Sequence, residues 1–401
     1  MPYSYRSNRT STMRRPSRSQ SSRPQKNRGG KTEYIHPSRF IKAASATVEE
    51  PYVPTHTFGD FNLHEVLQRN LIVKGYETPS PIQDQAIPVG LRGEDIVGIA
   101  NTGTGKTAAF ALPILHRLMT DSASRALIVA PTRELAQQIE AECKTMAKDS
   151  GLFGAILIGG TSMGPQLRDL RSNPRIVIGT PGRIKDHLNR GTLDLSRFNL
   201  VVLDEVDRML DMGFVKDMTE ILEAMASDRQ SFFFSATIDT RVRNLIANFT
   251  TNPQTVSLKA SSTSDNVHQN VVRYQAPGEK INKLHDLLIR QDTTKVIVFD
   301  ETQRSVERLS KELASRGFAC DAIHGGKSQG QRQRALRSFK QNEINILVAT
   351  DVAARGIDVT DITHVINYTT PKTYDEYIHR IGRTGRAGKI GHALTFVAGI
   401  H

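Results

Sequence analysis

The chain has 401 residues, of which 38% are hydrophobic and 23% are charged, and its formal net charge is +12. At about 150 residues per domain, this length predicts two or three domains, and its longest apolar run, AAFALPIL at 108–115, is too short to cross a membrane. Two distant cysteines, Cys143 and Cys320, argue against a disulfide framework or a zinc site, so we expect a cytoplasmic protein without a membrane segment.

The positive charge lies almost entirely at the amino terminus. Residues 1–42 hold eleven of the 53 Lys and Arg residues and one acid, Glu33, whereas the rest of the chain is close to neutral. Because this Arg- and Ser-rich segment has few apolar side chains to bury, residues 1–45 are predicted to be a disordered tail. Such a polycation can neutralise phosphates. The alternatives are a solubilising tail and a mitochondrial presequence, although the segment cannot form an amphipathic helix.

Beyond the tail, short apolar runs alternate with helical patterns. The runs are EDIVGIA, RALIVA, RIVIGT, NLVVLD and SFFFSAT in the first half and KVIVFD, INILVAT and THVINY in the second. Each run is continuously apolar, which is typical of a parallel sheet covered on both faces. A polar, Ser- and Thr-rich stretch separates the two halves. We therefore predict an α/β fold with two tandem parallel-sheet domains, at 85–257 and 269–401, a linker at 258–268 and an interdomain cleft.

A phosphate-binding loop follows the first predicted strand. Its residues are Gly103, Thr104, Gly105, Lys106 and Thr107. Glycines let several backbone N–H groups face a phosphate, and the following helix adds the positive end of its dipole. We expect Lys106 to bind the β- and γ-phosphates of ATP and the Thr107 hydroxyl to ligate Mg²⁺. Ala100 stands where the general pattern has its first glycine.

Three carboxylates lie at the end of the buried run NLVVLD: Asp204 is its last residue, and Glu205 and Asp207 follow it. Alone, an acidic strand end would indicate a solvated cap. A P-loop ATPase, however, needs an acid on a neighbouring strand to hold Mg²⁺. With the phosphate loop present, Asp204 is predicted to be a metal ligand, and Glu205 is predicted to be either the base for the attacking water or the group that orients it.

These motifs resemble those of the DEAD-box ATP-dependent RNA helicases, with Val206 giving DEVD in place of DEAD. The resemblance covers roughly residues 57–400. It implies two RecA-like domains, ATP and Mg²⁺ as cofactors, and RNA-stimulated ATP hydrolysis that unwinds or remodels short RNA duplexes or RNA–protein complexes. Two alternatives stay open: an ATP-gated RNA clamp with little unwinding, and a DNA translocase of the same superfamily.

The resemblance also assigns residues to the nucleotide. The segment at 56–84 contains GYETPSPIQ and resembles the family's adenine-recognition segment, or Q motif, which places Gln83 on the base and Phe58 beside it. HRIGRTGR at 379–386 implies that Arg383 and Arg386 are arginine fingers for the γ-phosphate. Asp358 is expected near the ribose.

Further residues are expected to bind RNA or to couple the two ligands. The coupling residues implied are Asp207, Ser235, Thr237 and His379. The RNA-binding residues implied are Pro131, Thr132, Arg133, Gly160, Thr180, Arg183, Gln329, Arg332 and Thr350. Loops of this kind suit phosphates, so little sequence preference is expected. We expect a monomer whose basic tail contacts ribosomal or structured RNA.

Overall fold

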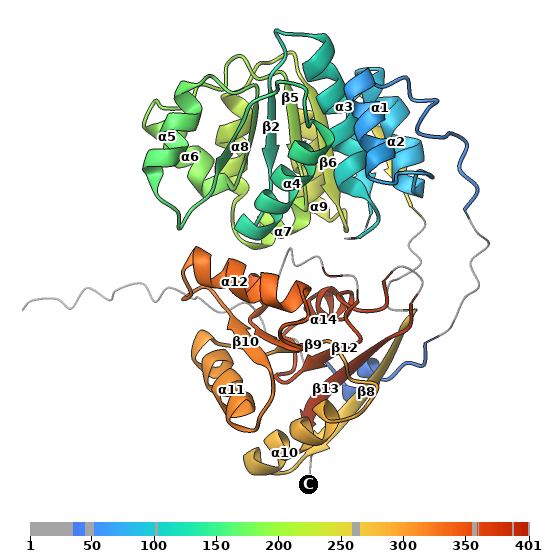
Figure 1. Ribbon diagram of the computed structural model, residues 1–401, viewed down its shortest axis with the longest axis vertical. Helices are drawn as coiled ribbons and strands as arrows, with labels where there is room; N and C mark the ends of the chain where they lie inside the picture. The colour runs from blue at the N-terminus through green and yellow to red at the C-terminus, as the bar shows by residue number, and fades with distance from the viewer. Residues whose placement is uncertain are drawn as a thin grey trace, which may run out of the picture.

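The computed structural model describes residues 35–44, 52–100, 103–258, 265–354, 359, 361–386 and 389–399. Within this part, two sheets with parallel strand pairing lie in two lobes, drawn one above the other in Figure 1. The predicted α/β fold with two tandem parallel-sheet domains is therefore confirmed. No helix among the described residues is long and apolar enough to span a bilayer.

The first domain is built on a seven-stranded sheet in the order β3-β4-β2-β5-β6-β1-β7. Its strands are β1 (Ile96–Ile99), β2 (Ala126–Val129), β3 (Gly154–Leu157), β4 (Ile176–Gly179), β5 (Leu200–Leu203), β6 (Gln230–Ser235) and β7 (Gln254–Ser257). Its helices are α1 (Glu65–Val73), α2 (Pro81–Leu91), α3 (Lys106–Thr120), α4 (Arg133–Met146), α5 (Met163–Arg171), α6 (Pro181–Asn189), α7 (Val206–Asp211), α8 (Val215–Glu223) and α9 (Thr240–Phe249).

The second domain is built on a six-stranded sheet in the order β10-β11-β9-β12-β13-β8. Its strands are β8 (Val267–Tyr274), β9 (Val296–Phe299), β10 (Cys320–Ile323), β11 (Ile346–Ala349), β12 (His364–Asn367) and β13 (Gly391–Ala398). Its helices are α10 (Pro277–Leu288), α11 (Gln303–Ser315), α12 (Gln329–Lys340), α13 (Asp351–Ala354) and α14 (Tyr374–Ile381), and a 3-10 turn, η1 (Pro37–Phe40), lies beside them.

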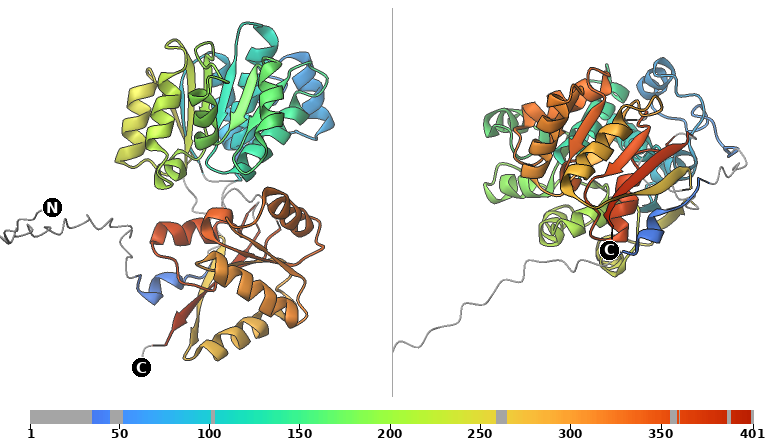
Figure 2. Two further views of the ribbon diagram at one scale, coloured as in Figure 1. Left: turned by 90° about the vertical axis from the view of Figure 1, so that its left-hand side faces the viewer. Right: turned by 90° about the horizontal axis from the view of Figure 1, so that it is seen from below.

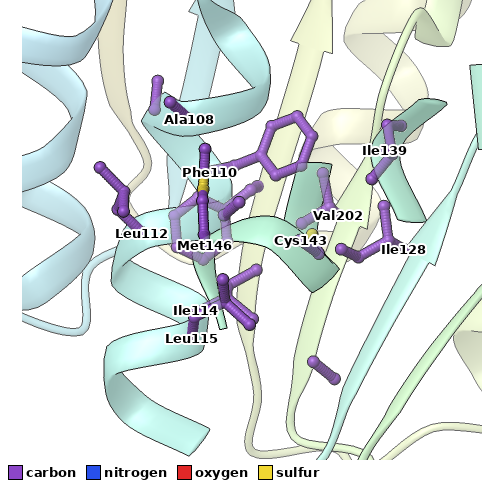
Figure 3. Packing of buried hydrophobic residues seen from close by; sticks show 14 of the residues in the cluster. Ala108, Phe110, Leu112, Ile114, Leu115, Ile128, Ile139, Cys143, Met146 and Val202 are labelled. Carbon is purple, nitrogen blue, oxygen red and sulfur yellow. The ribbon is translucent and has the colours of Figure 1, made fainter. Parts of the chain in front are cut away.

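The apolar runs became strands because both faces of each sheet are covered. Successive residues point to opposite faces of a strand, so Ile128 and Val202 enter one hydrophobic cluster while Leu127 and Val201 enter another. Figure 3 shows the first cluster, in which Phe110 of α3 packs among side chains of the sheet and α4. This double burial explains why the strands lack polar alternation.

Two parts of the chain differ from the sequence expectation. β7 lies in the polar stretch between the two halves and was missed, because it is an edge strand with only Val256 buried. Residues 35–44, assigned to the disordered tail, are instead packed against the second domain, because Ile35 and Phe40 supply apolar side chains that the rest of the tail lacks. The remaining tail, residues 1–34 and 45, lies outside the described residues.

Candidate active site

The phosphate loop follows β1, whose neighbour in the sheet is β6, which in turn pairs with β5. Because parallel strands end at the same edge, the residues that follow these three strands come together there. Gly103 and Gly105 have positive φ values of 87° and 92°, which favour glycine. Gly105 is the N-cap of α3, so the N-terminus of α3 faces the loop.

Gln83 fastens the Q-motif segment to this loop. Its Nε2 donates to the Gly105 carbonyl at 3.1 Å, and its Oε1 accepts from the Ser80 N–H at 2.9 Å. A Cβ on Gly105 would lie only 2.6 Å from the Gln83 Nε2, so the contact needs glycine there. The Gln83 amide, expected on adenine, thus also binds the phosphate loop. Phe58, expected near the base, is buried with its ring edge-on to Phe61 and Tyr76.

The acidic residues lie beside the loop. The Lys106 Nζ is 3.6 Å from Asp204 Oδ1, and both side chains are buried. Glu205 has a left-handed backbone with φ 55°, and its Oε2 accepts from the Arg208 Nη1 at 2.8 Å. Its other oxygen, Oε1, is buried and has no hydrogen-bond partner among the described residues. One oxygen of Glu205 is therefore fixed and the other is available to a ligand or water.

Electrostatics separates the two carboxylates. Burial raises the pKa of Asp204, although Lys106 opposes this effect. Burial would also raise the pKa of Glu205, but the charges of Arg208, Lys106 and Arg383 outweigh it and lower that pKa. Arg383 belongs to the second domain, so the protonation of Glu205 depends on a residue from across the cleft.

The residues expected to hold Mg²⁺ fit that ion. Thr107 is in the first turn of α3, and Asp204 directly follows β5 and has a buried carboxylate. Hydroxyl and carboxylate oxygens are the ligands that Mg²⁺ prefers. The unsatisfied Glu205 Oε1 beside Asp204 leaves a polar group that a metal-bound water could meet.

Three of the expected coupling residues form one hydrogen-bonded unit. Asp207 Oδ2 accepts from the Thr237 N–H and from Thr237 Oγ1, both at 3.0 Å. The Asp207 N–H donates to Ser235 Oγ at 3.3 Å. The fourth residue, His379, lines a narrow space between the domains together with Arg208 and Arg383. The hydrogen bonds that Asp207 makes with Ser235 and Thr237 join the segment after β5 to the carboxyl end of β6.

The expected arginine fingers follow α14 and face the first domain. A Cβ added to Gly103 would lie 3.8 Å from the Arg386 Nη1, so this guanidinium is beside the phosphate loop. Arg386 Nε donates to the Gly382 carbonyl at 2.8 Å, which fixes its orientation. Arg383 is buried. Asp358, expected near the ribose, lies outside the described residues.

A second group of expected residues follows β2, β3 and β4, which are neighbours in the sheet. Arg133 lies across the turn at Gly160, where an added Cβ would be 2.0 Å from the Arg133 Nη1. Arg183 Nη2 donates to the Thr161 carbonyl at 3.5 Å. Pro131, Thr132 and Thr180 belong to the same loops, and the buried Thr350 directly follows β11 in the second domain. The structure thus gathers the first-domain residues at one sheet edge.

Gln329 and Arg332 of α12, which were expected to face RNA, contact the first domain. Arg332 Nη2 donates to Glu134 Oε2 at 2.8 Å, and both side chains are buried. Gln329 Nε2 donates to Gln137 Oε1 at 3.0 Å and to Glu134 Oε1 at 3.3 Å. These two donors therefore link α12 to α4 across the cleft.

Sequence reasoning missed Arg208, Glu134 and Arg380. Arg208 was detectable, because it lies three residues after Glu205 at the start of a helix. Glu134 gave no signal, since its partners are about 200 residues away. Arg380 is held by Asp351 at 2.6 and 2.7 Å and by Glu376 at 2.7 Å, and it packs under Phe299. A buried network of this kind has no local pattern.

Comparisons with known proteins agree with the motifs. The family model described as DEAD/DEAH box helicase matches residues 80–245, and the one described as Helicase conserved C-terminal domain matches 279–388. A Bacillus subtilis protein named DEAD-box ATP-dependent RNA helicase CshA is 44% identical over 86% of this chain and 70% of its own length. A Listeria monocytogenes protein named ATP-dependent RNA helicase CshA is 45% identical over 85% of this chain and 66% of its own length.

A solved structure is also similar. That of S. cerevisiae Dbp5 bound to RNA and ADP BeF3 is 29% identical, covers 86% of this chain and 90% of that chain, and has a TM-score of 0.76.

Proposed function

The chain belongs to the DEAD/DEAH box helicases and is an ATP-dependent RNA helicase, and from this premise we propose that it hydrolyses ATP between its two domains with the residues described above. The observation that carries the proposal is the position of Arg386, whose guanidinium lies beside Gly103 of the phosphate loop although the two residues belong to different domains. A cation of the second domain therefore lies at the phosphate loop of the first domain, so both domains contribute residues to one site.

The proposed roles follow from charge and position. Lys106 and the N–H groups of the loop bind the phosphates, and Arg383 and Arg386 stabilise the charge that spreads over the γ-phosphoryl group in the transition state. Thr107 and Asp204 would hold Mg²⁺, which neutralises phosphate charge when bound. Glu205 orients the attacking water through Oε1, because Arg208 holds its other oxygen.

RNA is proposed to bind along the loops that follow β2, β3 and β4 and to continue onto the second domain at Thr350. Backbone N–H groups, Thr hydroxyls and Arg side chains suit phosphates, so little sequence preference is expected. ATP and RNA each favour the arrangement in which the domains meet, so their binding should be cooperative. The similar structure of Dbp5, bound to RNA and ADP BeF3, supports this arrangement.

Glu205→Gln tests the catalytic centre. The amide keeps the shape of the side chain but cannot accept a proton, so we expect nucleotide and RNA binding to persist while RNA-stimulated phosphate release falls by about 10²-fold or more. Single-turnover phosphate release and fluorescent nucleotide titration would measure the two quantities separately. Asp211→Asn, which changes an exposed carboxylate at the end of the same helix, is the matched control. Turnover in Glu205→Gln at the wild-type rate would refute the role of Glu205.

Unwinding is tested by strand displacement. We expect the wild-type chain with ATP to release the labelled strand of a short RNA duplex repeatedly. We expect Glu205→Gln to bind the duplex once with ATP and not to continue with further rounds of displacement. Closed-state RNA binding without any displacement would instead support an ATP-gated clamp.

A further inference from the structure

Residues 35–44 precede the first domain in sequence but pack on helix α14 of the second. The Phe40 side chain is fully buried, and its ring centroid is 4.7 Å from that of Tyr377. The Arg39 guanidinium lies 3.9 Å above the ring of Tyr374. These two tyrosines are one turn apart on the same face of α14. Figure 2 shows this segment, in blue, against the red and gold elements of the second domain.

The same segment also pairs with the edge strand β8. The Lys42 N–H donates to the Gln269 carbonyl at 3.0 Å, and the Gln269 N–H donates to the Lys42 carbonyl at 2.8 Å, which forms one antiparallel bridge. Lys42 forms an ion pair with Asp265, and the Ala44 N–H donates to His268 Nδ1 at 3.1 Å. The segment therefore holds β8 and α14 together, and we call residues 35–44 the strap.

β8 and α14 together frame the turn that carries the arginine fingers. α14 ends at Ile381, just before Arg383 and Arg386. Within the turn, Gly385 has φ 70°, and a Cβ there would be 2.7 Å from Val267 Cγ2 and 3.2 Å from the Asn266 carbonyl oxygen at the start of β8. The finger turn is thus wedged between the two elements that the strap connects.

We propose that the strap is a positioning element of the ATPase: by fastening α14 to β8 it fixes the finger turn, and Phe40 is its principal positioning residue. Tyr377 transmits the contact, because its ring packs on Phe40 while its hydroxyl donates to Gln269 Oε1 at 2.9 Å. Catalytic groups must be held to within a fraction of an ångström, so a loosened α14 should weaken transition-state stabilisation. This inference rests on the proposed roles of Arg383 and Arg386.

Phe40→Ala in the full chain tests the proposal. We expect the maximal rate of RNA-stimulated ATP hydrolysis to fall on the order of tenfold, while the affinity for a fluorescent ADP analogue without RNA stays unchanged, because the fingers act only on the γ-phosphoryl group. Phe40→Leu should recover most of the rate. Ile41→Ala, which removes an exposed side chain from the same segment, should behave as the wild type.

The outcomes separate a positioning role from a merely structural one. If Phe40→Ala lowers the melting temperature but hydrolyses ATP at the wild-type rate per folded molecule, the strap only stabilises the domain and the proposal is wrong. If Phe40→Ala does not fold, Arg39→Gln decides in the same way, because it removes only the contact with Tyr374. If the wild type itself shows no RNA-stimulated hydrolysis, the proposed function fails rather than the strap.

Discussion

Glu205 combines an unfavourable backbone with an incompletely satisfied side chain. A positive φ is uncommon for residues other than glycine and costs on the order of 1–3 kcal/mol when tertiary contacts enforce it. Here the carboxylate is buried and Arg208 binds one of its oxygens. The DEVD pattern predicted a cluster of carboxylates after β5, and the structure places Asp204 of this cluster beside Lys106 of the phosphate loop. The pattern could not predict that Arg208 binds one oxygen of Glu205 and leaves the other buried without a hydrogen-bond partner among the described residues, since that follows from the tight turn between β5 and α7.

Three histidines form a stacked row across neighbouring strands of the second sheet. His364 of β12 is in register with His392 of β13, which is in register with His268 of β8. The ring centroids are 4.8 Å apart for the first pair and 5.4 Å for the second. Burial and the neighbouring His392 lower the pKa of His364 to about 4, while Asp292 and Arg290 act on it weakly and in opposite directions.

This row predicts a loss of stability in mild acid. Between about pH 6.5 and pH 4 the unfolded chain binds a proton at residue 364 that the folded chain does not, so the free energy of unfolding falls as the pH falls, by up to about 3 kcal/mol. Urea unfolding followed across this pH range would measure it. His364→Phe keeps a stacking ring without a titrating nitrogen and should flatten the profile, whereas His285→Phe, outside the row, should not. An unchanged slope in His364→Phe would contradict the assignment.

At the scale of elements, the contact between α4 and α12 joins the two domains. Figure 1 shows α12 on the side of the second domain that faces the first. The pair formed by Glu134 and Arg332 is buried. Removal of one member of a buried ion pair leaves an uncompensated charge and typically costs about 3–5 kcal/mol. Because the pair joins the two domains, its removal should destabilise the closed arrangement and leave each domain by itself unaffected.

Glu134→Ala and Arg332→Ala should therefore each weaken RNA binding in the presence of a non-hydrolysable ATP analogue by on the order of 10²-fold, and the double variant should lose less than the sum. Equilibrium RNA titrations of the four proteins would complete the cycle. The exchanged pair Glu134→Arg with Arg332→Glu distinguishes the two roles of Arg332: it should restore binding if the pair closes the cleft, and should not if Arg332 must contact RNA phosphates.

The elements themselves were largely predictable, because buried strands are continuously apolar and helices begin with caps. A capping box formed by Ser328 and Gln331 begins α12, and its three-residue spacing is a cap signature that can be read from sequence. β7, the strap and the contact between α4 and α12 were not predictable. Each depends on which distant surfaces meet, and neither apolar periodicity nor turn chemistry encodes that.

At the scale of the whole molecule, the segment before residue 45 consists of two parts, the strap and the more basic residues 1–34. Residues 1–34 carry nine of the eleven Lys and Arg residues of the segment 1–42, while Arg39 and Lys42 are engaged with the second domain. Beyond the strap, the Tyr52 hydroxyl and the Thr55 and His56 N–H groups all donate to Asp84, beside Gln83. The chain thus passes from the second domain to the first before it enters the first sheet.

Two truncations should separate these parts. Deletion of residues 1–34 removes cations that can release RNA counterions, so we expect a shallower dependence of RNA affinity on salt with an unchanged maximal rate of hydrolysis. Deletion of residues 1–44 should lower that rate as well. Filter binding at several salt concentrations and steady-state ATPase assays would measure both. Identical salt dependence in the shorter deletion would exclude the tail from RNA binding, and equal rates in both deletions would argue against the strap.

The strap also has a consequence for the order in which the protein can fold. Residues 35–44 leave the ribosome before both of their partners, because β8 and α14 are synthesised more than 220 and more than 320 residues later. The first domain can complete its sheet during this interval, since β1 to β7 are contiguous in sequence. The second domain cannot complete its sheet in the same interval, because β8 to β13 are synthesised after the first domain. The Phe40 ring stays without its partner until α14 has been synthesised, so this contact of high sequence separation should form late in folding.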